Sequence, residues 1–269
     1  ARERLEAEQE RAGALGRELE ESRERLESVA NMIRGFSLKA EAKVKKAAAA
    51  AEEKAALEKK IGAMTGRLEL LRDMERDYEG MSRAVKAVMQ QSARGALKHI
   101  RGPVSQLIHV EDRFAAAVEI ALGGALQNIV VEREEDAKAA IGFLKSGDLG
   151  RATFLPMSAV RGSELTEKLH GEAGFLGLAS ELVSCGEEYR PIIRQLLGRT
   201  AVADHIDNAI RMARKFSNRF RIVTLDGQVL NVGGAMTGGS LGRGTGILTR
   251  ANERARLERE LSAFDEALA

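Results

Sequence analysis

The residues of this chain whose types and spacing could do chemistry are two glycine pairs, Gly233–Gly234 and Gly238–Gly239, in the run Asn-Val-Gly-Gly-Ala-Met-Thr-Gly-Gly-Ser. Glycine carries no Cβ, so paired glycines let a second backbone come close. Three interpretations stay open: a generic loop, a cradle for an anion, and a close-packed interface. An anion cradle would need a nearby lysine and a helix N-terminus. The strand-like run from 220 to 232 offers an edge to a partner, so we favour the interface.

Catalytic or metal chemistry is not indicated. The histidines are scattered and lack metal-ligand spacing with the one cysteine, Cys185. The run from 242 to 246, Gly-Arg-Gly-Thr-Gly, resembles a phosphate loop but has no lysine and no full Gly-x-Gly-x-x-Gly spacing. A flexible exit from the globular part is the better interpretation. We therefore expect this chain to be no enzyme and to hold neither metal nor cofactor.

Composition indicates a chain that is partly coiled coil. Aromatic residues make up 4% of the 269 residues and charged residues 30%, which suits helices with an aliphatic seam and charged outer faces. The net charge of +2 gives no global cationic field, so nucleic-acid binding would need a local patch. A single cysteine fits a reducing cytoplasm, and no apolar run approaches the roughly 18 residues of a membrane span. Both ends fall within helical patterns, so we expect a fragment.

A heptad pattern predicts a long outgoing coiled-coil helix. One register connects Leu5 to about Val85, with a weak seam between 39 and 54, and would extend roughly 120 Å at about 1.5 Å per residue. The alternative is a charged single helix or a disordered segment, which six glycines in this region favour. Apolar spacing returns near the C-terminus, at Leu257, Leu261, Phe264 and Leu268. The simplest geometry packs this second helix antiparallel against the region from Met64 to Val85.

Between the helices, strand and helix signals alternate. The expected strands are 103–108, 127–131, 151–155, 182–183 and 200–203, and the expected helices are 111–122, 136–145, 187–197 and 207–216. Asp226–Gly227 predicts a hairpin between 220–225 and 228–232. Two halves of similar order predict two subdomains in an α+β fold. We divide the chain into an outgoing arm (1–93), a globular domain (94–246) and a returning arm (247–269).

Basic residues gather at both junctions between the arms and the globular part. Arg94, Lys98 and Arg101 mark the entry, and Arg243, Arg250 and Arg254 mark the exit, of which we assign all but Arg254 to DNA contact. Paired arms would bring both groups together, where they could contact DNA phosphates without reading sequence. A second run extends from Arg190 to Arg221, and it either contacts phosphates as well or only solvates a face.

Four ordered motifs resemble the hinge domain of bacterial SMC (structural maintenance of chromosomes) proteins. They are Gly-Pro-Val-Ser-Gln-Leu-Ile at 102–108, Ala-Leu-Gly-Gly-Ala-Leu-Gln-Asn-Ile-Val-Val at 121–131, Phe-Arg-Ile-Val-Thr-Leu-Asp-Gly at 220–227, and Gly-Gly-Ala-Met-Thr-Gly-Gly-Ser at 233–240. The resemblance covers about 94–250. It implies a two-subdomain SMC-type hinge inserted between antiparallel coiled-coil helices.

The resemblance also implies a homodimer joined at the hinge. Gly233, Gly234, Gly238 and Gly239 correspond to the family's interface glycines, and we place Gly123 and Gly124 at the same interface. Many relatives have a lysine-rich stretch directly afterwards, whereas this chain has only Arg243 there, so DNA contact is expected to be weak. ATP and Mg²⁺ are implied only for ATPase heads that lie outside this fragment.

For the whole protein, the resemblance implies an ATPase of chromosome condensation and segregation in the cytoplasm, associated with the nucleoid and with accessory condensin subunits. The alternative is a coiled-coil scaffold whose globular head binds a different protein partner. Solution mass separates the two interpretations, because only the hinge requires a two-fold self-complex.

Overall fold

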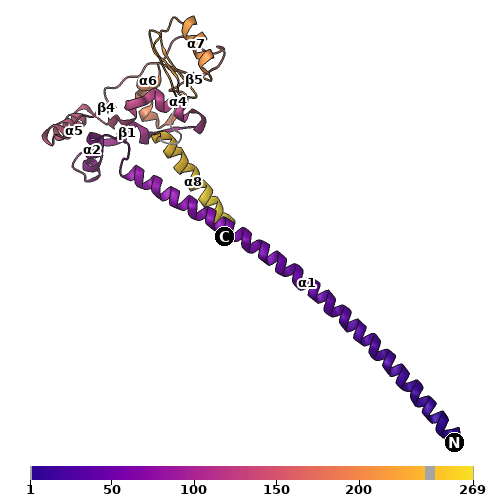
Figure 1. Ribbon diagram of the computed structural model, residues 1–269. Coiled ribbons are helices and arrows are strands. Elements are labelled where there is room, and N and C mark those ends of the chain that lie inside the picture. The colour runs from indigo at the N-terminus through magenta and orange to yellow at the C-terminus, as the bar shows by residue number, and fades with distance from the viewer. Residues whose placement is uncertain (1, 240–245, 269) are drawn as a thin grey trace. The chain divides into compact units, whose positions relative to one another are not determined.

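The computed structural model describes residues 2–239 and 246–268, and they fall into two compact units, 1–63 and 64–269. The first unit is helical throughout and belongs to helix α1 (Arg2–Arg76). The second contains the last turns of α1 and all other elements (Figure 1). Mixed helix and sheet in this second unit confirms the predicted α+β class.

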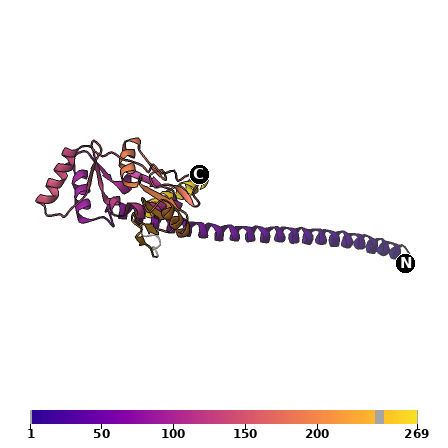
Figure 2. The ribbon, with the colours of Figure 1, turned by 90° about the horizontal axis from the view of Figure 1, so that it is seen from above.

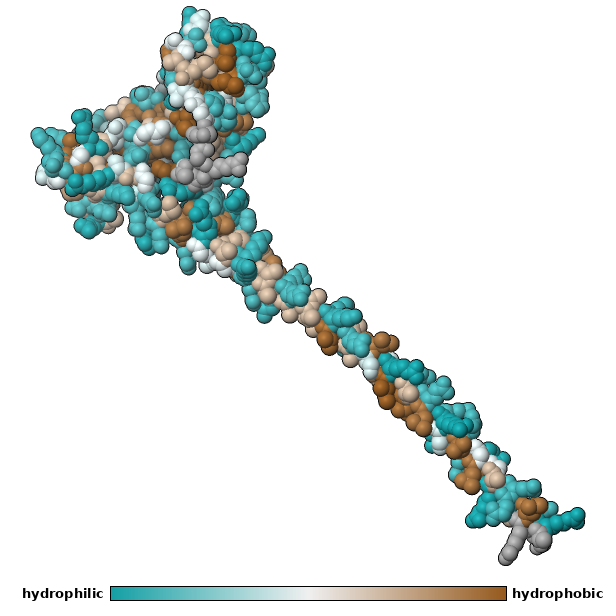
Figure 3. Space-filling view, in the orientation of Figure 1, coloured by the Kyte–Doolittle hydropathy of each residue, from teal (hydrophilic) through white to brown (hydrophobic). Residues whose placement is uncertain are grey.

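The first unit exposes the apolar positions of its heptads. Brown patches follow the helix in Figure 3, and the large apolar side chains with the greatest exposure include Leu26 at 70% and Phe36 at 69%. A helix that buries so little apolar surface within its own chain is not stabilised by tertiary packing. The predicted seam is therefore present without a partner within residues 2–63.

The heptad register predicted through Val85 is wrong at its end. Helix α1 stops at Arg76, and the chain turns through Tyr78 and Gly80, whose φ angles are 52° and 88°. A new helix, α2 (Arg83–Ala93), then begins at Ser82, whose Oγ accepts a hydrogen bond from the backbone N–H of Val85. The apolar residues of α2 have helical spacing because one face of this helix packs into the globular unit. In the sequence this spacing cannot be distinguished from a continued coiled coil.

The first half of the globular unit surrounds a three-stranded sheet, in the order β1-β3-β4. Its elements are β1 (Ile100–Pro103), α3 (Val104–Leu107), β2 (Ile108–Val110), α4 (Asp112–Leu122), the 3₁₀ helix η1 (Gly123–Gln127), β3 (Ile129–Val131), α5 (Glu134–Ser146) and β4 (Phe154–Pro156). The strand predicted at 103–108 is wrong, because a helical turn separates β1 from β2. Helices α2 and α5 lie side by side in both ribbon views (Figures 1 and 2).

The second half is built on a five-stranded sheet, in the order β10-β9-β8-β7-β5. Its elements are β5 (Phe175–Leu178), β6 (Val183–Cys185), the 3₁₀ helix η2 (Glu187–Tyr189), α6 (Arg190–Leu197), β7 (Thr200–Ala203), α7 (Ile206–Lys215), β8 (Arg221–Thr224), β9 (Val229–Leu230) and β10 (Met236–Thr237). The hairpin predicted around Asp226–Gly227 is confirmed, since Ile222 pairs with Leu230 and Val223 with Val229. Strands β5 and β10 had no counterpart in the prediction.

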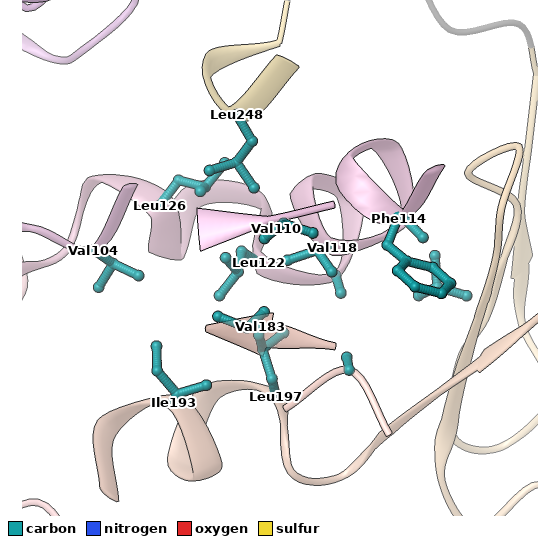
Figure 4. Packing of buried hydrophobic residues seen from close by; sticks show 14 of the residues in the cluster. Val104, Val110, Phe114, Val118, Leu122, Leu126, Val183, Ile193, Leu197 and Leu248 are labelled. Atoms are coloured by element: carbon teal, nitrogen blue, oxygen red, sulfur yellow. The ribbon is translucent and has the colours of Figure 1, made fainter. Parts of the chain in front are cut away.

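One hydrophobic core joins the two halves. Val118 and Leu122 of α4 lie in the same cluster as Ile193 and Leu197 of α6 (Figure 4). Strand β2 of the first half also pairs antiparallel with β6 of the second. Smaller clusters lie to either side, one under α2 and α5, the other under α7. Each half therefore has its own sheet and its own smaller cluster, as the predicted two subdomains require, and the largest cluster joins them.

Helix α8 (Ile247–Leu268) packs against the last turns of α1, and we call this contact the arm seam. The arm seam consists of Met64, Leu68 and Leu71 on α1 and Leu257, Leu261 and Phe264 on α8. The helices are antiparallel: Glu75 pairs with Arg254 at 2.8 Å and, one turn back on α1, Arg72 pairs with Glu258 at 2.9 Å. The predicted fold-back geometry is thus confirmed, although the side chain of Leu268 lies outside the described residues.

Arg67 adds a bidentate contact to the arm seam, donating to both carboxylate oxygens of Glu253 at 2.8 and 2.7 Å. These hydrogen bonds, together with the charge of Arg67, lower the pKa of the Glu253 carboxyl. A lowered carboxyl pKa contributes stability above the unfolded-state pKa, and this contribution is lost as the pH falls through the folded-state value. The arm seam is therefore weakened on the acid side.

We predict that cysteines at Leu68 and Leu261 cross-link within one chain. In a Cys185→Ser background, a short bis-maleimide should join Leu68→Cys to Leu261→Cys, because both side chains belong to the arm seam. The product should migrate as a monomer in denaturing electrophoresis. Leu70→Cys with Leu261→Cys is the matched control, since Leu70 is 50% exposed. Cross-linking between chains only, or equal yields for both pairs, would contradict the antiparallel seam.

Candidate dimer interface

The two predicted glycine pairs lie on one surface feature, which we call the glycine hairpin (residues 229–239). Strand β9 leads into a tight turn in which the N–H of Asn231 donates to the carbonyl of Ala235 at 2.7 Å and the N–H of Gly234 to that of Asn231 at 3.0 Å. Strand β10 then returns beside β9, with Met236 opposite Leu230 and Thr237 opposite Val229. The hairpin extends the five-stranded sheet to its edge.

Glycine is required in the hairpin by the backbone itself. Gly233, Gly234 and Gly239 have φ angles of 82°, 95° and 146°, which residues with a Cβ rarely adopt. Gly238 has a different reason, because a Cβ there would overlap the side-chain amide of Gln228. Around Gly233 and Gly239 a Cβ would meet nothing within 4 Å, so their space is open towards any partner.

Gln228 holds the end of the hairpin. Its Oε1 accepts from the N–H of Gly239 at 3.2 Å, and its Nε2 donates to the carbonyl of Gly239 at 3.3 Å. This side chain thereby supplies both hydrogen bonds that a further strand residue would make. Sequence reasoning missed this role, because a glutamine eleven positions away from its partner carries no local signal.

The outer edge of β10 is free to receive another backbone within the part of the chain that the structure describes. Strand β10 is bonded to β9 on one side and ends the sheet on the other. Next to this edge, Val232 is 63% and Met236 55% exposed. Natural proteins usually protect edge strands, so an exposed edge with apolar side chains marks a site for pairing. The hairpin can thus offer both main-chain hydrogen bonds and apolar contacts.

Gly123 and Gly124 lie on a different element from the hairpin. Gly123 ends α4 with a φ of 50°, and both glycines open η1, which leads to β3 of the three-stranded sheet. Gly124 also lines a cavity of about 260 Å³ together with Ser82, Gln127 and Arg151. The six predicted interface glycines therefore form two sets, one on each half of the globular unit.

The end of α4 is held by Arg221 of β8. Its guanidinium donates to the carbonyls of Ala121 at 2.7 Å and Ile120 at 3.2 Å. Burial lowers the pKa of Arg221 from its ordinary value, but a guanidinium remains charged at neutral pH. The cation compensates the negative end of the helix dipole and the unpaired carbonyls of its last turn. Arg221 thus serves in packing and is not available to phosphates.

The basic residues predicted for DNA contact lie on several elements. Arg94 is exposed at the end of α2 and Lys98 in the loop before β1, and Arg101 in β1 pairs with Glu132 at 2.7 Å. Arg250 lies on α8 and donates to the carbonyl of Glu79 at 3.1 Å, while Arg243 lies outside the described residues. Helix α2 contacts α5 and β1, whereas α8 contacts α4 and β2. Because α1 ends at Arg76, Arg94 does not lie on the arm helix, and the convergence of the two basic groups stays a prediction.

Among residues 2–239 and 246–268, no group of three or more His, Cys, Asp or Glu side chains is placed to hold a metal ion. Over the same residues, no helix has both the length and the apolar character to cross a bilayer. The chemistry that this surface supports is recognition of a backbone and of apolar side chains.

Comparison with known proteins points in one direction. The family described as "SMC proteins Flexible Hinge Domain" matches residues 97–213. The Chromosome partition protein Smc of Bacillus subtilis is 38% identical over 206 residues, which are 75% of this chain and 17% of that protein. This chain therefore spans less than a fifth of that relative's length.

Solved structures agree. A crystal structure of an asymmetric dimer of the Geobacillus stearothermophilus SMC hinge domain matches with a TM-score of 0.71 and 38% identity, over 78% of this chain and 85% of that one. The Pyrococcus furiosus Smc hinge domain with an extended coiled coil matches with a TM-score of 0.52 and 27% identity, over 78% of this chain and 81% of that one.

We predict that Arg221→Met destabilises the fold. The change keeps an apolar stem but leaves the carbonyls of Ile120 and Ala121 without their donor, which should lower the free energy of unfolding by about 1–3 kcal/mol. Urea denaturation followed by circular dichroism measures the loss. Arg219→Met, at an exposed position two residues away, is the control and should change stability little. Equal losses for both variants would show that the guanidinium does not hold α4.

Proposed function

Because this chain belongs to the SMC hinge family, we propose that it joins two copies of its protein through the glycine hairpin and the Gly123–Gly124 turn. The observation that carries this proposal is the open edge of β10, with its exposed Val232 and Met236. Two glycine sets on separate halves of the unit suit a two-fold complex, in which the same contact is made twice. The similar Geobacillus stearothermophilus hinge domain was crystallised as an asymmetric dimer, which supports self-association of this chain.

The exposed stripe of the first unit has a place in this proposal. In the arm seam, α8 covers α1 only from Met64 onwards, and the apolar positions from Leu5 to Leu57 have no cover within the described chain. We propose that a further stretch of the returning arm packs on them in the same antiparallel register. The exposed apolar side chains would then form the seam of a two-stranded coiled coil.

For the whole protein we propose a role in chromosome partition, the role that the names of its relatives state. We propose that ATP drives this role, as the family resemblance implies. ATP and Mg²⁺ would bind to head domains elsewhere in the protein, and accessory condensin subunits would act there as well. The protein would work in the cytoplasm on the nucleoid. In this arrangement the hinge binds no nucleotide and contributes the joint between two arms.

Weak, sequence-independent DNA contact is a further part of the proposal. Arg94 at the end of α2 and Lys98 in the loop before β1 have exposed side chains, and such cations attract phosphates whatever the base sequence. The aromatic side chains of the cluster under α2, namely Tyr78, Phe143 and Phe154, are packed against its core, so we expect no stacking of single bases on them. Arg101 and Arg250 already have partners and would contribute less.

Dimerisation is tested at the hairpin edge. We predict that Val232→Lys/Met236→Lys weakens the dimer at least tenfold, because two charges replace exposed apolar side chains where a partner strand should pack. The change adds no backbone strain to the monomer. Replacing Gly233, Gly234, Gly238 and Gly239 by Ala should produce a monomer as well, with added strain at the positive φ angles. Sedimentation velocity over a concentration series measures the effect.

The matched control for these variants is Ile141→Lys on α5, where the side chain is 52% exposed and the glycine hairpin is distant in sequence. Ile141→Lys should dimerise as the wild type does. Circular dichroism checks that each variant is folded. A wild-type chain that is monomeric at all concentrations, or a folded edge variant that dimerises normally, would refute the interface.

DNA contact is tested by charge reversal. Arg94→Glu/Lys98→Glu should lower the affinity for double-stranded DNA at low salt. It should also make the slope of log affinity against log salt concentration shallower by about two, because two phosphate contacts are lost. Arg211→Glu/Arg214→Glu on α7 makes the same charge change on the second basic run and should have little effect. Fluorescence anisotropy with two unrelated duplexes gives the affinities. Equal losses for both variants would indicate a general charge effect and remove the assignment to α2.

A further inference from the structure

The first turn of α8 is capped by a side chain from a distant helix. Glu119 of α4 accepts hydrogen bonds from the backbone N–H groups of Ile247 at 2.8 Å and Leu248 at 3.2 Å, one with each carboxylate oxygen. The first N–H groups of a helix have no partner within the helix, and its N-terminal end carries partial positive charge. A carboxylate at this point satisfies both requirements. The side chain of Glu119 thus caps the N-terminus of α8.

The neighbouring residues are arranged around this cap. Gly246 lies against the Glu119 carboxylate so closely that a Cβ built on it would overlap the carboxylate atoms. Leu248 is 2% exposed and its side chain reaches into the shared core beside Leu126 (Figure 4). One turn later, the buried side-chain amide of Asn252 donates to the carbonyl of Val110 at 2.8 Å. These contacts seat the start of α8 on α4 and β2.

The residues that follow Glu119 hold the two other parts of the candidate dimer interface. The carbonyls of Ile120 and Ala121 accept from Arg221 of β8, and β8 is joined through β9 to the edge strand β10. Gly123 and Gly124 come directly afterwards. The segment 119–124 therefore contacts the start of the returning arm and the sheet that ends in the glycine hairpin, and it contains the second glycine set.

We propose that the segment 119–124 couples the seat of α8 to dimerisation, so that release of the Glu119 cap weakens the dimer. This inference rests on the proposed dimer interface. When the cap is made, the last turn of α4 is fixed from both sides, by Glu119 towards α8 and by Arg221 towards the sheet. When it is lost, the carboxylate turns to solvent, and the turn that places Gly123 and Gly124 loses one of its two attachments. A bound partner selects the fixed arrangement.

Coupling of this kind is reciprocal. If the cap strengthens the dimer by some factor, dimerisation must strengthen the cap by the same factor. The proposal therefore makes two measurable statements, one about variants and one about the unmodified chain. The second needs no substitution and holds even where a variant folds poorly.

Two variants weaken the cap, one by changing the carboxylate and the other by changing the glycine that lies against it. Glu119→Gln removes the charge and one acceptor, and Gly246→Ala keeps the charge but pushes the carboxylate away. Each should raise the dimer dissociation constant about fivefold or more, the ordinary range of coupling between sites. The controls are Glu111→Gln, where the carboxylate pairs with exposed Arg113, and Gly142→Ala, where a Cβ would meet nothing within 4 Å. Both controls should stay within about twofold of the wild type.

The unmodified chain is examined by amide hydrogen exchange. The N–H groups of Ile247 and Leu248 should exchange more slowly in the dimer than in the diluted monomer, by about the factor found for Glu119→Gln. A wild type that stays monomeric refutes the proposed interface and the coupling with it. A wild type that dimerises, with a dissociation constant unaffected by both cap variants or with equal exchange in monomer and dimer, refutes the coupling alone and leaves the interface standing.

Discussion

The buried face of α4 is the constraint on which the rest of the globular unit depends. Its side chains, among them Phe114, Val118 and Leu122, lie in the one cluster that contains residues of both halves. Burying an apolar side chain of this size contributes about 1.5–3 kcal/mol relative to exposure. The same helix contacts α6 and β8 of the second half and α8 of the arm. The cluster that joins the two sheets therefore depends on this helix, whereas the smaller clusters under α2 and α7 form without it.

The sequence correctly predicted the elements that are determined by residues close together in the chain. The Asp226–Gly227 turn, the end of α4 at Gly123 and the helix α5 are each encoded within a few residues, and the structure has them. The register beyond Arg76 failed because α2 has the apolar spacing of a coil but buries it against β3 and α5. Strand β10 is only two residues long and exposed, so no alternation of apolar and polar residues could reveal it.

The candidate interface shows the same division. The paired glycines were visible in the sequence. The structure adds the reason for them, namely the positive φ angles of the backbone, which spacing alone does not predict. The side chains that support the interface were not visible. Glu119 reaches a backbone 128 positions away and Arg221 one 100 positions away, and nothing in either neighbourhood distinguishes them from other charged residues on amphipathic elements. Contacts at such separations follow from topology, which a single sequence leaves open.

The two strands of the arm are attached to the globular unit in different ways. Helix α8 enters it directly, with Ile247 capped, Leu248 in the core and Asn252 bonded to β2. Helix α1 stops at Arg76 and is linked through a turned segment with positive φ at Tyr78 and Gly80 before α2 begins. One helix of the arm thus enters the globular unit directly, whereas the other is connected to it through a turn. If the arm bends, we expect the force to reach the globular unit mainly through α8. The turn between α1 and α2 could change its conformation to accommodate the bend.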